Sequence, residues 1–268
     1  MVKVGETTCK GILNKSGIEG VDYAINPYIG CTHGCVYCYA KFMTRWYHQG
    51  EKWGTFVDAK INAVDRIKEE APKKKKGTIL LSSVTDPYQP IEKKYELTRG
   101  ILENLSEHSF PVEILTKSSL VTRDLEIITE IDECEVGFTL TSFDDTIRKV
   151  FEPNASSTQE RIEALEALNE VGVDTYAFIG PLLPYLSDES LEDLLNALAD
   201  KVDRVLVDRL NIKAGNWGNI RQAIEDNYPE LLVKIKEATA NDSPYYQRLG
   251  RRVRSLLEER MIPADILF

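Results

Sequence analysis

The 268 residues, of which 43% are hydrophobic, suffice for one large α/β domain built around a single core. Charged residues make up 28% of the chain, and no stretch approaches the roughly 18 consecutive apolar residues of a membrane-spanning helix. The N-terminus lacks the apolar centre of a secretory signal, which predicts a cytoplasmic protein with reduced thiols. The net charge of −10 disfavours a nucleic-acid partner unless the surface carries a local basic patch.

Short β-branched runs alternate with amphipathic segments after the first 20 residues, a pattern typical of βα units and a parallel sheet. The predicted strands are residues 23–28, 78–82, 112–116, 135–141, 175–179 and 202–207. Six such units predict an α/β fold, a partial (β/α)6 barrel of the TIM type, over residues 22–212. Residues 1–21 would form a separate N-terminal segment.

Helix signals occur between the predicted strands and after the last of them. Ser157 followed by Glu160 is typical of a capping box, and the helix after the fifth strand is predicted to begin at Ser187. Beyond residue 212 the strand pattern stops, and residues 217–240 and 243–261 are predicted to be helices. The sequence therefore predicts a helical C-terminal extension over residues 213–268.

Three of the five cysteines, Cys31, Cys35 and Cys38, follow the first predicted strand with the spacing C-x3-C-x2-C. Thiolates are the usual protein ligands of a [4Fe–4S] cluster, and three of them leave one of its four irons open. An open iron can chelate the amino and carboxylate groups of S-adenosyl-L-methionine and hold its sulfonium close to the cluster. The spacing therefore predicts both cofactors, with the radical chemistry carried by the cofactors themselves.

Other interpretations of these cysteines remain open. His33 could complete four zinc ligands, although its place between two of the cysteines would strain tetrahedral geometry. A disulfide is disfavoured by the reducing compartment and the odd cysteine count. A non-catalytic iron–sulfur protein for electron transfer or sensing would need the same ligands. Cys9 and Cys134 have no neighbouring cysteine or histidine and are expected to be incidental or buried thiols.

The motif C-x3-C-x-aromatic-C, with Tyr37 at the aromatic position, resembles that of the radical S-adenosylmethionine (radical SAM) superfamily. Further segments are similar to its spore photoproduct lyase branch: SSVTDPYQPIEKKYELTRGILE, EILTKSSLVTRDLEII, FTLTSFDDTIRKVFEPNASSTQERIEAL and AFIGPLLP. This resemblance implies an enzyme that cleaves S-adenosylmethionine to a 5′-deoxyadenosyl radical, which abstracts hydrogen from the substrate. It also implies a site at the carboxyl ends of the strands and a reductant such as flavodoxin or ferredoxin.

By position, the resemblance further implies a set of residues around S-adenosylmethionine: Tyr37, Thr85, Asp86, Lys117 and Ser142. Lys117 and Ser142 would bind its carboxylate, for which an ammonium and a hydroxyl are suitable donors. Tyr39 matches a tyrosine implicated in hydrogen relay and is the expected catalytic residue. Several residues at strand ends are expected to face the substrate: Tyr88, Gln89, Asp208, Arg209 and Asn211.

One position departs from the lyase pattern. Where the lyases have a cysteine that returns a hydrogen atom to the product radical, this chain has Ser83. An O–H bond is much stronger than a thiol S–H bond, so a serine cannot readily replace the cysteine. We therefore expect a lyase-like enzyme that does not repair the thymine lesion efficiently. Its substrate stays open among nucleic acids, peptides and small molecules. A nucleic acid could be bound through its phosphates by Arg248, Arg251 and Arg252.

Overall fold

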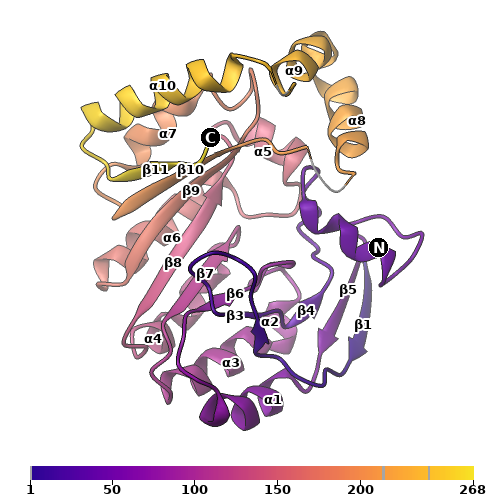
Figure 1. Cartoon of the computed structure of the whole chain (residues 1–268), viewed down its shortest axis with the longest axis vertical. Coiled ribbons are helices and arrows are strands. Elements are labelled where there is room, and N and C mark those ends of the chain that lie inside the picture. The colour runs from indigo at the N-terminus through magenta and orange to yellow at the C-terminus, as the bar shows by residue number, and fades with distance from the viewer. Residues whose placement is uncertain (1, 213–214, 241) are drawn as a thin grey trace.

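The computed structural model describes residues 2–212, 215–240 and 242–268, and these form two β-sheets flanked by helices (Figure 1). The main sheet has eight strands in the order β11-β10-β9-β8-β7-β6-β3-β2. Their bounds are β2 Asn14–Lys15, β3 Tyr23–Ile25, β6 Ile79–Leu81, β7 Val112–Thr116, β8 Cys134–Leu140, β9 Asp174–Leu182, β10 Arg204–Arg209 and β11 Ala264–Ile266. The second sheet has the order β1-β5-β4, with β1 Lys3–Thr7, β5 Phe56–Lys60 and β4 Tyr28–Ile29.

Six consecutive strands of the main sheet, from β3 to β10, run parallel to their neighbours. They correspond to the six predicted strands, and the sheet curves without closing, since β2 and β11 form its two edges. The predicted α/β partial barrel is therefore confirmed. Parallel strands covered on both faces are apolar along most of their length, and β8 is buried at nearly every position.

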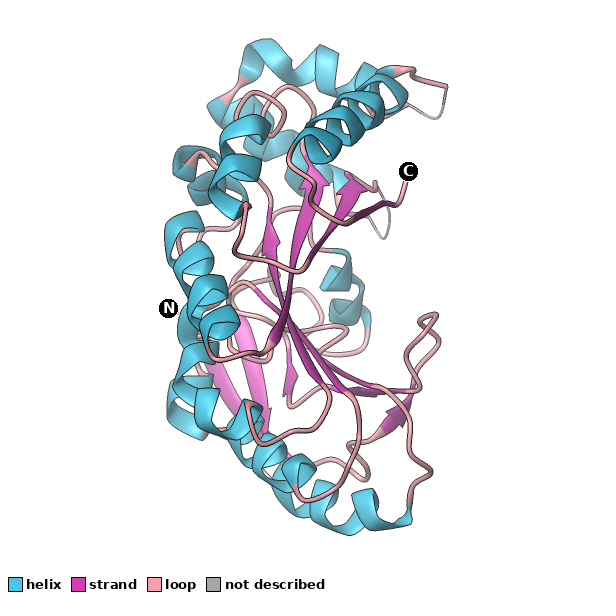
Figure 2. Cartoon of the chain, turned by 90° about the vertical axis from the view of Figure 1, so that its left-hand side faces the viewer, coloured by secondary structure: helices cyan, strands magenta, loops and turns pink. Residues whose placement is uncertain are grey.

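Most helices lie along one side of the curved sheet (Figure 2). Their bounds are α1 Ala63–Glu70, α2 Glu92–Tyr95, α3 Leu97–Ser106, α4 Leu125–Ile128, α5 Asp145–Phe151, α6 Thr158–Glu170, α7 Leu191–Leu198, α8 Trp217–Asn227, α9 Leu232–Ala238 and α10 Tyr245–Glu259. Short 3₁₀ helices are η1 Tyr39–Arg45, η2 Ala71–Lys73, η3 Ser119–Asp124 and η4 Pro229–Leu231. Within the described residues, no helix combines the length and apolar character needed to cross a membrane.

Local signals within the barrel predicted one helix start correctly and another wrongly. The capping box is confirmed: the Ser157 hydroxyl accepts from the Glu160 amide, and the Glu160 carboxylate accepts from the Ser157 amide. The start at Ser187 is wrong, because α7 begins after Ser190 and the Ser187 hydroxyl instead accepts from the amide of Leu183. Ser187 therefore stabilises the loop before the helix.

Prolines account for two other differences from the predicted elements. The first predicted strand divides at Pro27, which has no N–H for the ladder, so β3 stays in the main sheet and β4 pairs with β5. The helix predicted over residues 217–240 divides at Pro229 into α8, η4 and α9.

Both terminal segments also contribute strands to the main sheet. In residues 1–21, β2 pairs with β3, and in residues 213–268, β11 pairs with β10. The C-terminal extension thus contains a strand as well as the predicted helices. β11 has only three residues, too few for a periodic pattern to reveal it.

We predict that Gly137→Ala destabilises the sheet, because a Cβ there would lie 2.2 Å from the ring of Tyr176. That ring cannot move easily: it is 1% exposed, its hydroxyl donates to Glu113 at 2.8 Å, and the Arg204 guanidinium covers it. Overpacking of this kind costs about 1–3 kcal/mol in the free energy of unfolding, measured by urea titration. Gly218→Ala in α8, where nothing lies within 4 Å, is the control and should be neutral or stabilising. Equal stability of the two variants would contradict the prediction.

Candidate active site

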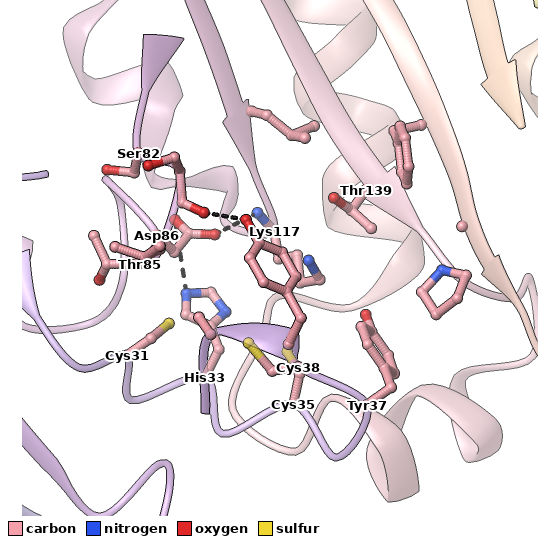
Figure 3. A pocket seen from close by; sticks show the side chains of 18 of the residues that line it. Cys31, His33, Cys35, Tyr37, Cys38, Ser82, Thr85, Asp86, Lys117 and Thr139 are labelled. Atoms are coloured by element: carbon pink, nitrogen blue, oxygen red, sulfur yellow. Dashed lines mark hydrogen bonds and ion pairs between the residues drawn. The ribbon is translucent and has the colours of Figure 1, made fainter. Parts of the chain in front are cut away.

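The three cysteines of the motif lie in the segment between β4 and η1, which passes across the carboxyl ends of the parallel strands. A cavity of about 280 Å³ opens there, lined by this segment and by residues near or after the ends of β6, β7, β8, β9 and β10. Barrel enzymes assemble their sites at this end of the sheet because the loops after the strands converge there. Figure 3 shows the sulfurs of Cys31, Cys35 and Cys38 on one side of the loop, facing the cavity.

The three thiols form no disulfide and are largely withdrawn from solvent. Cys31 and Cys35 are 8% and 7% exposed, and none of the five cysteines is in a disulfide. Burial raises the pKa of Cys35 to about 12 and raises the pKa values of Cys31 and Cys38 as well. A buried thiol in an apolar setting is inert unless a metal replaces its proton. The donor set therefore suits a soft metal centre.

A single zinc ion is the other metal that the sequence left open for these cysteines. Among the described residues, no group of three or more His, Cys, Asp and Glu side chains converges tightly enough to hold one metal ion. Zinc needs four ligands around one centre, whereas in a cubane each thiolate binds a different iron. His33 is 1% exposed, and neither of its ring nitrogens has a hydrogen-bond partner. Its Nε2 lies 3.9 Å from a carboxylate oxygen of Asp86.

Thr85 lines the cavity, but its hydroxyl is engaged by the cysteine loop. Thr85 Oγ1 donates to the carbonyl of Gly30 at 2.6 Å and accepts from Gln89 Nε2 at 2.9 Å. The Gln89 carbonyl oxygen in turn accepts from the amide of Thr32 at 2.9 Å. Both side chains thus fix the backbone on either side of Cys31.

Asp86 and Lys117 also line the cavity, but only the Asp86 side chain has hydrogen-bond partners within the described residues. The Asp86 carboxylate accepts from Thr116 Oγ1 at 2.7 Å and from the amides of Tyr88 and Lys117, both at 2.9 Å. Lys117 Nζ has no hydrogen bond or ion pair within the described residues and lies 5.8 Å from the Tyr37 ring centroid. Burial alone would lower the pKa of Lys117, but the carboxylates of Glu152 and Asp86 help to outweigh burial and the pKa is raised, so the ammonium stays charged.

Ser142 is absent from the cavity lining. It is 1% exposed, its hydroxyl lies 3.0 Å from that of Ser190, and it accepts from the amide of Asp144 at 3.1 Å. Thr139, three residues earlier on β8, lines the cavity instead. The geometry therefore does not bring Ser142 to the ligand position that the sequence resemblance implies, and its role there stays an untested prediction.

Sequence reasoning missed a buried charged network behind Tyr37. The Tyr37 hydroxyl donates to the Glu152 carboxylate, which also accepts from Thr141 Oγ1 at 2.8 Å. Glu152 and Arg161 form an ion pair at 2.6 Å in which both side chains are 0% exposed. The one available signal was an arginine at an inward-facing position of α6, since unpaired arginines are almost never fully buried.

The outer part of the cavity is formed by residues that are more exposed. Tyr39, 53% exposed, donates its hydroxyl to the carbonyl of Ser83, and both residues line the cavity. Asp208, Arg209 and Asn211, after and at the end of β10, line it from another side. Tyr88 and Gln89 were expected to face the substrate, but both are 0% exposed and neither lines the cavity.

Comparison with known proteins identifies the family to which the chain belongs. Residues 25–198, which include the cysteine loop and the four parallel strands from β6 to β9, match the family described as the radical SAM superfamily. The chain belongs to the radical SAM superfamily. Membership implies an enzyme, and it agrees with three thiols on one loop at the carboxyl ends of a partial barrel.

Relatives and solved structures extend the comparison over the whole chain. An uncharacterised protein of Methanocaldococcus jannaschii is 40% identical over 239 residues, 89% of each chain. An uncharacterised protein of Mycobacterium tuberculosis is 30% identical over 96% of this chain and 78% of its own length. Among solved structures, a spore photoproduct lyase variant superposes with a TM-score of 0.73 at 15% identity, covering 99% of this chain and 82% of the lyase. At that identity the likeness supports the fold alone.

Proposed function

We propose that this radical SAM protein holds a [4Fe–4S] cluster on Cys31, Cys35 and Cys38 and uses it to cleave S-adenosylmethionine reductively. The observation that carries the proposal is the grouping of three buried thiols with an unpaired ammonium, that of Lys117, around one cavity. The bound cofactors would supply the electron and the 5′-deoxyadenosyl radical that abstracts hydrogen from a substrate. Flavodoxin or ferredoxin is the proposed class of electron donor.

The residues of the cavity suit S-adenosylmethionine in charge and in shape. Lys117 is a buried, charged donor with no carboxylate partner of its own among the described residues, so it can bind the carboxylate of the methionine moiety. The Tyr37 ring, fixed through its hydroxyl, offers an apolar face beside the cysteine loop for the adenine or the methionine chain. Thr85 and Asp86 act by holding the Cys31 loop and the Lys117 backbone, because their polar atoms are already bonded there.

Substrate would enter at the outer part of the cavity, between Tyr39 and the residues after β10. Arg209 is exposed, and its guanidinium lies 5.9 Å from the ring of Tyr246 in α10. Tyr39 would stand between cofactor and substrate, where a hydrogen relay through its hydroxyl requires it to be. These features suit a polar or anionic substrate and leave nucleic acids, peptides and small molecules as the classes to be tested.

We predict that anaerobic reconstitution loads about four irons per chain and that Cys31→Ala, Cys35→Ala and Cys38→Ala each abolish this loading, since each removes one of three thiolates. Cys9→Ala and Cys134→Ala are matched controls, because Cys9 bonds Asn62 outside the cavity and Cys134 begins β8 at the opposite end of the sheet. Iron content and electron paramagnetic resonance after dithionite reduction measure the outcome. Stoichiometric zinc without iron would refute the cluster.

The same preparations decide between an enzyme and a non-catalytic iron–sulfur protein. Reduced wild-type protein incubated with S-adenosylmethionine should release 5′-deoxyadenosine, which liquid chromatography detects. A fully loaded cluster that releases none, with dithionite in excess, would favour electron transfer or sensing.

A further prediction concerns Lys117, whose ammonium is proposed to bind the carboxylate of S-adenosylmethionine. Lys117→Met should retain the cluster and weaken binding of S-adenosylmethionine about 10-fold to 150-fold, the range expected for losing a hydrogen bond of roughly 1.5–3 kcal/mol to a charged group. Isothermal titration calorimetry measures the affinity. Ser142→Ala is the comparison: unchanged affinity would follow from its position outside the cavity lining, whereas a comparable loss would restore the role implied by the resemblance.

Efficient repair of the spore photoproduct is not part of the proposal. Ser83 lines the cavity where the lyases have their hydrogen-donating cysteine, and its hydroxyl accepts from Asn26 Nδ2 at 3.1 Å. Within the described residues, the cysteines of the cavity are the three proposed cluster ligands. Incubation of the reduced protein with a lesion-containing dinucleotide should therefore yield little thymine. Repeated clean turnover would show that a tyrosine such as Tyr39 replaces the thiol, and Ser83→Cys should raise the thymine yield if the missing thiol is the limitation.

A further inference from the structure

The segment from Phe151 to Ser156, which joins α5 to α6, contacts the cysteine loop at several points although more than a hundred residues separate them. The Phe151 carbonyl accepts from the amide of Val36 at 2.9 Å. Asn154 donates twice to the loop, from its backbone amide to His33 O at 3.3 Å and from Nδ2 to Thr32 O at 2.8 Å. Together with the Tyr37–Glu152 bond, these contacts reach the loop on both sides of Cys35.

Glu152 is the most constrained residue of this segment. Burial alone would raise the pKa of its carboxyl group, but Arg161 and Lys117 outweigh burial and hold the pKa at about 2. Arg161 is itself fixed, donating to Thr139 O at 2.7 Å and to Ser156 O at 2.9 Å. Removing one partner of a buried ion pair is strongly destabilising, so this acceptor cannot easily leave the Tyr37 hydroxyl.

The same segment also contacts the turn after β7 that carries Lys117. The amide of Ser156 donates to the Lys117 carbonyl at 3.1 Å, and Ser156 Oγ accepts from the amide of Ser119 at 3.0 Å. One short segment therefore contacts both the loop with the thiols and the turn with the ammonium. A core connection that served packing alone would need neither set of contacts.

We infer that Glu152 and Asn154 are positioning residues of the active site, which fix the loop from Thr32 to Cys38 and so set the positions of the Cys35 and Cys38 thiols before any cluster binds. The inference rests on the proposed function for the identity of what the thiols hold. Its structural part, a loop held in place in the iron-free protein, can be tested without that function. Neither residue lines the cavity, so both act through the loop.

The test uses two conservative variants of the full chain, Tyr37→Phe and Asn154→Ala. Each removes one side-chain contact of the loop and leaves the Glu152–Arg161 ion pair intact. Tyr176→Phe is the matched control, because it removes another tyrosine–glutamate hydrogen bond, to Glu113, between two residues that do not line the cavity. Asn104→Ala, which removes an amide donor to Gly100 O in α3, is the control for Asn154.

The first measurement is amide hydrogen exchange of the iron-free proteins. In Tyr37→Phe and Asn154→Ala the amide of Val36 should exchange about tenfold faster than in the wild type. The reason is that the free energy of local opening falls by about the contribution of one hydrogen bond. The two controls should leave Val36 unchanged. Unchanged exchange of Val36 in both loop variants would overturn the inference, even if the wild type binds a cluster as proposed.

The second measurement is the electron paramagnetic resonance spectrum and midpoint potential of reconstituted protein. Tyr37→Phe should keep the wild-type iron content but shift the signal and the potential, whereas Tyr176→Phe should shift neither. If the Tyr37–Glu152 contact served stability alone, Tyr37→Phe would lower stability without changing the midpoint potential of the cluster. Faster exchange of Val36 together with an unshifted resonance signal and potential would therefore also overturn the inference. If the wild type itself takes up no iron, the proposed function fails, and hydrogen exchange still judges the loop contacts separately.

Discussion

The structure depends on satisfying the backbone polar groups of a short, irregular loop that carries three buried thiols. A loop without regular structure cannot pair its own N–H and C=O groups, and leaving them unpaired inside the protein is costly. Two segments supply the partners: Thr85 and Gln89 after β6 bind Gly30 and Thr32, and the segment after α5 binds Thr32, His33 and Val36. The ends of the parallel strands bring these segments together, so the conformation of the loop depends on the barrel.

The same constraint explains the charges of the cavity. Three donors occupy the Asp86 carboxylate, and Arg161, Thr141 and Tyr37 occupy that of Glu152, so neither carboxylate is free to neutralise Lys117. The ammonium is thereby kept charged and available for an anionic ligand. The two carboxylates lie near enough to raise the pKa of Lys117, but their oxygens are bonded to other groups. The lysine is therefore charged although it is buried, and its ammonium can still bind a ligand.

The parts of this architecture that local sequence encodes could be predicted, and the parts that depend on distant contacts could not. Cysteine spacing and β-branched runs are local: the runs predicted the six parallel strands, and the cysteine motif, through the family resemblance, implied a site at their carboxyl ends. Ser142 and Thr139 both lie near the end of β8, and only the path of the chain after it decides that Ser142 turns to Ser190 and away from the cavity. The role of Glu152 depends on a partner 115 residues away along the chain, which no local pattern reveals.

Under the proposed function, the residues that would hold the cofactor and those that would meet the substrate lie in different parts of the cavity. The inner part of the cavity is supported by buried carboxylates, those of Asp86 and Glu152, whose oxygens have protein partners, so a substitution of either alters the loop and the proposed cofactor site together. The outer part is formed by exposed side chains, Tyr39 and Arg209, and by Ser83, whose main constraints are Asn26 and the Tyr39 hydroxyl. Residues with few partners can change without disturbing the loop. A serine at position 83 can therefore accompany a change of substrate while the cysteines, Lys117 and their supports stay in place.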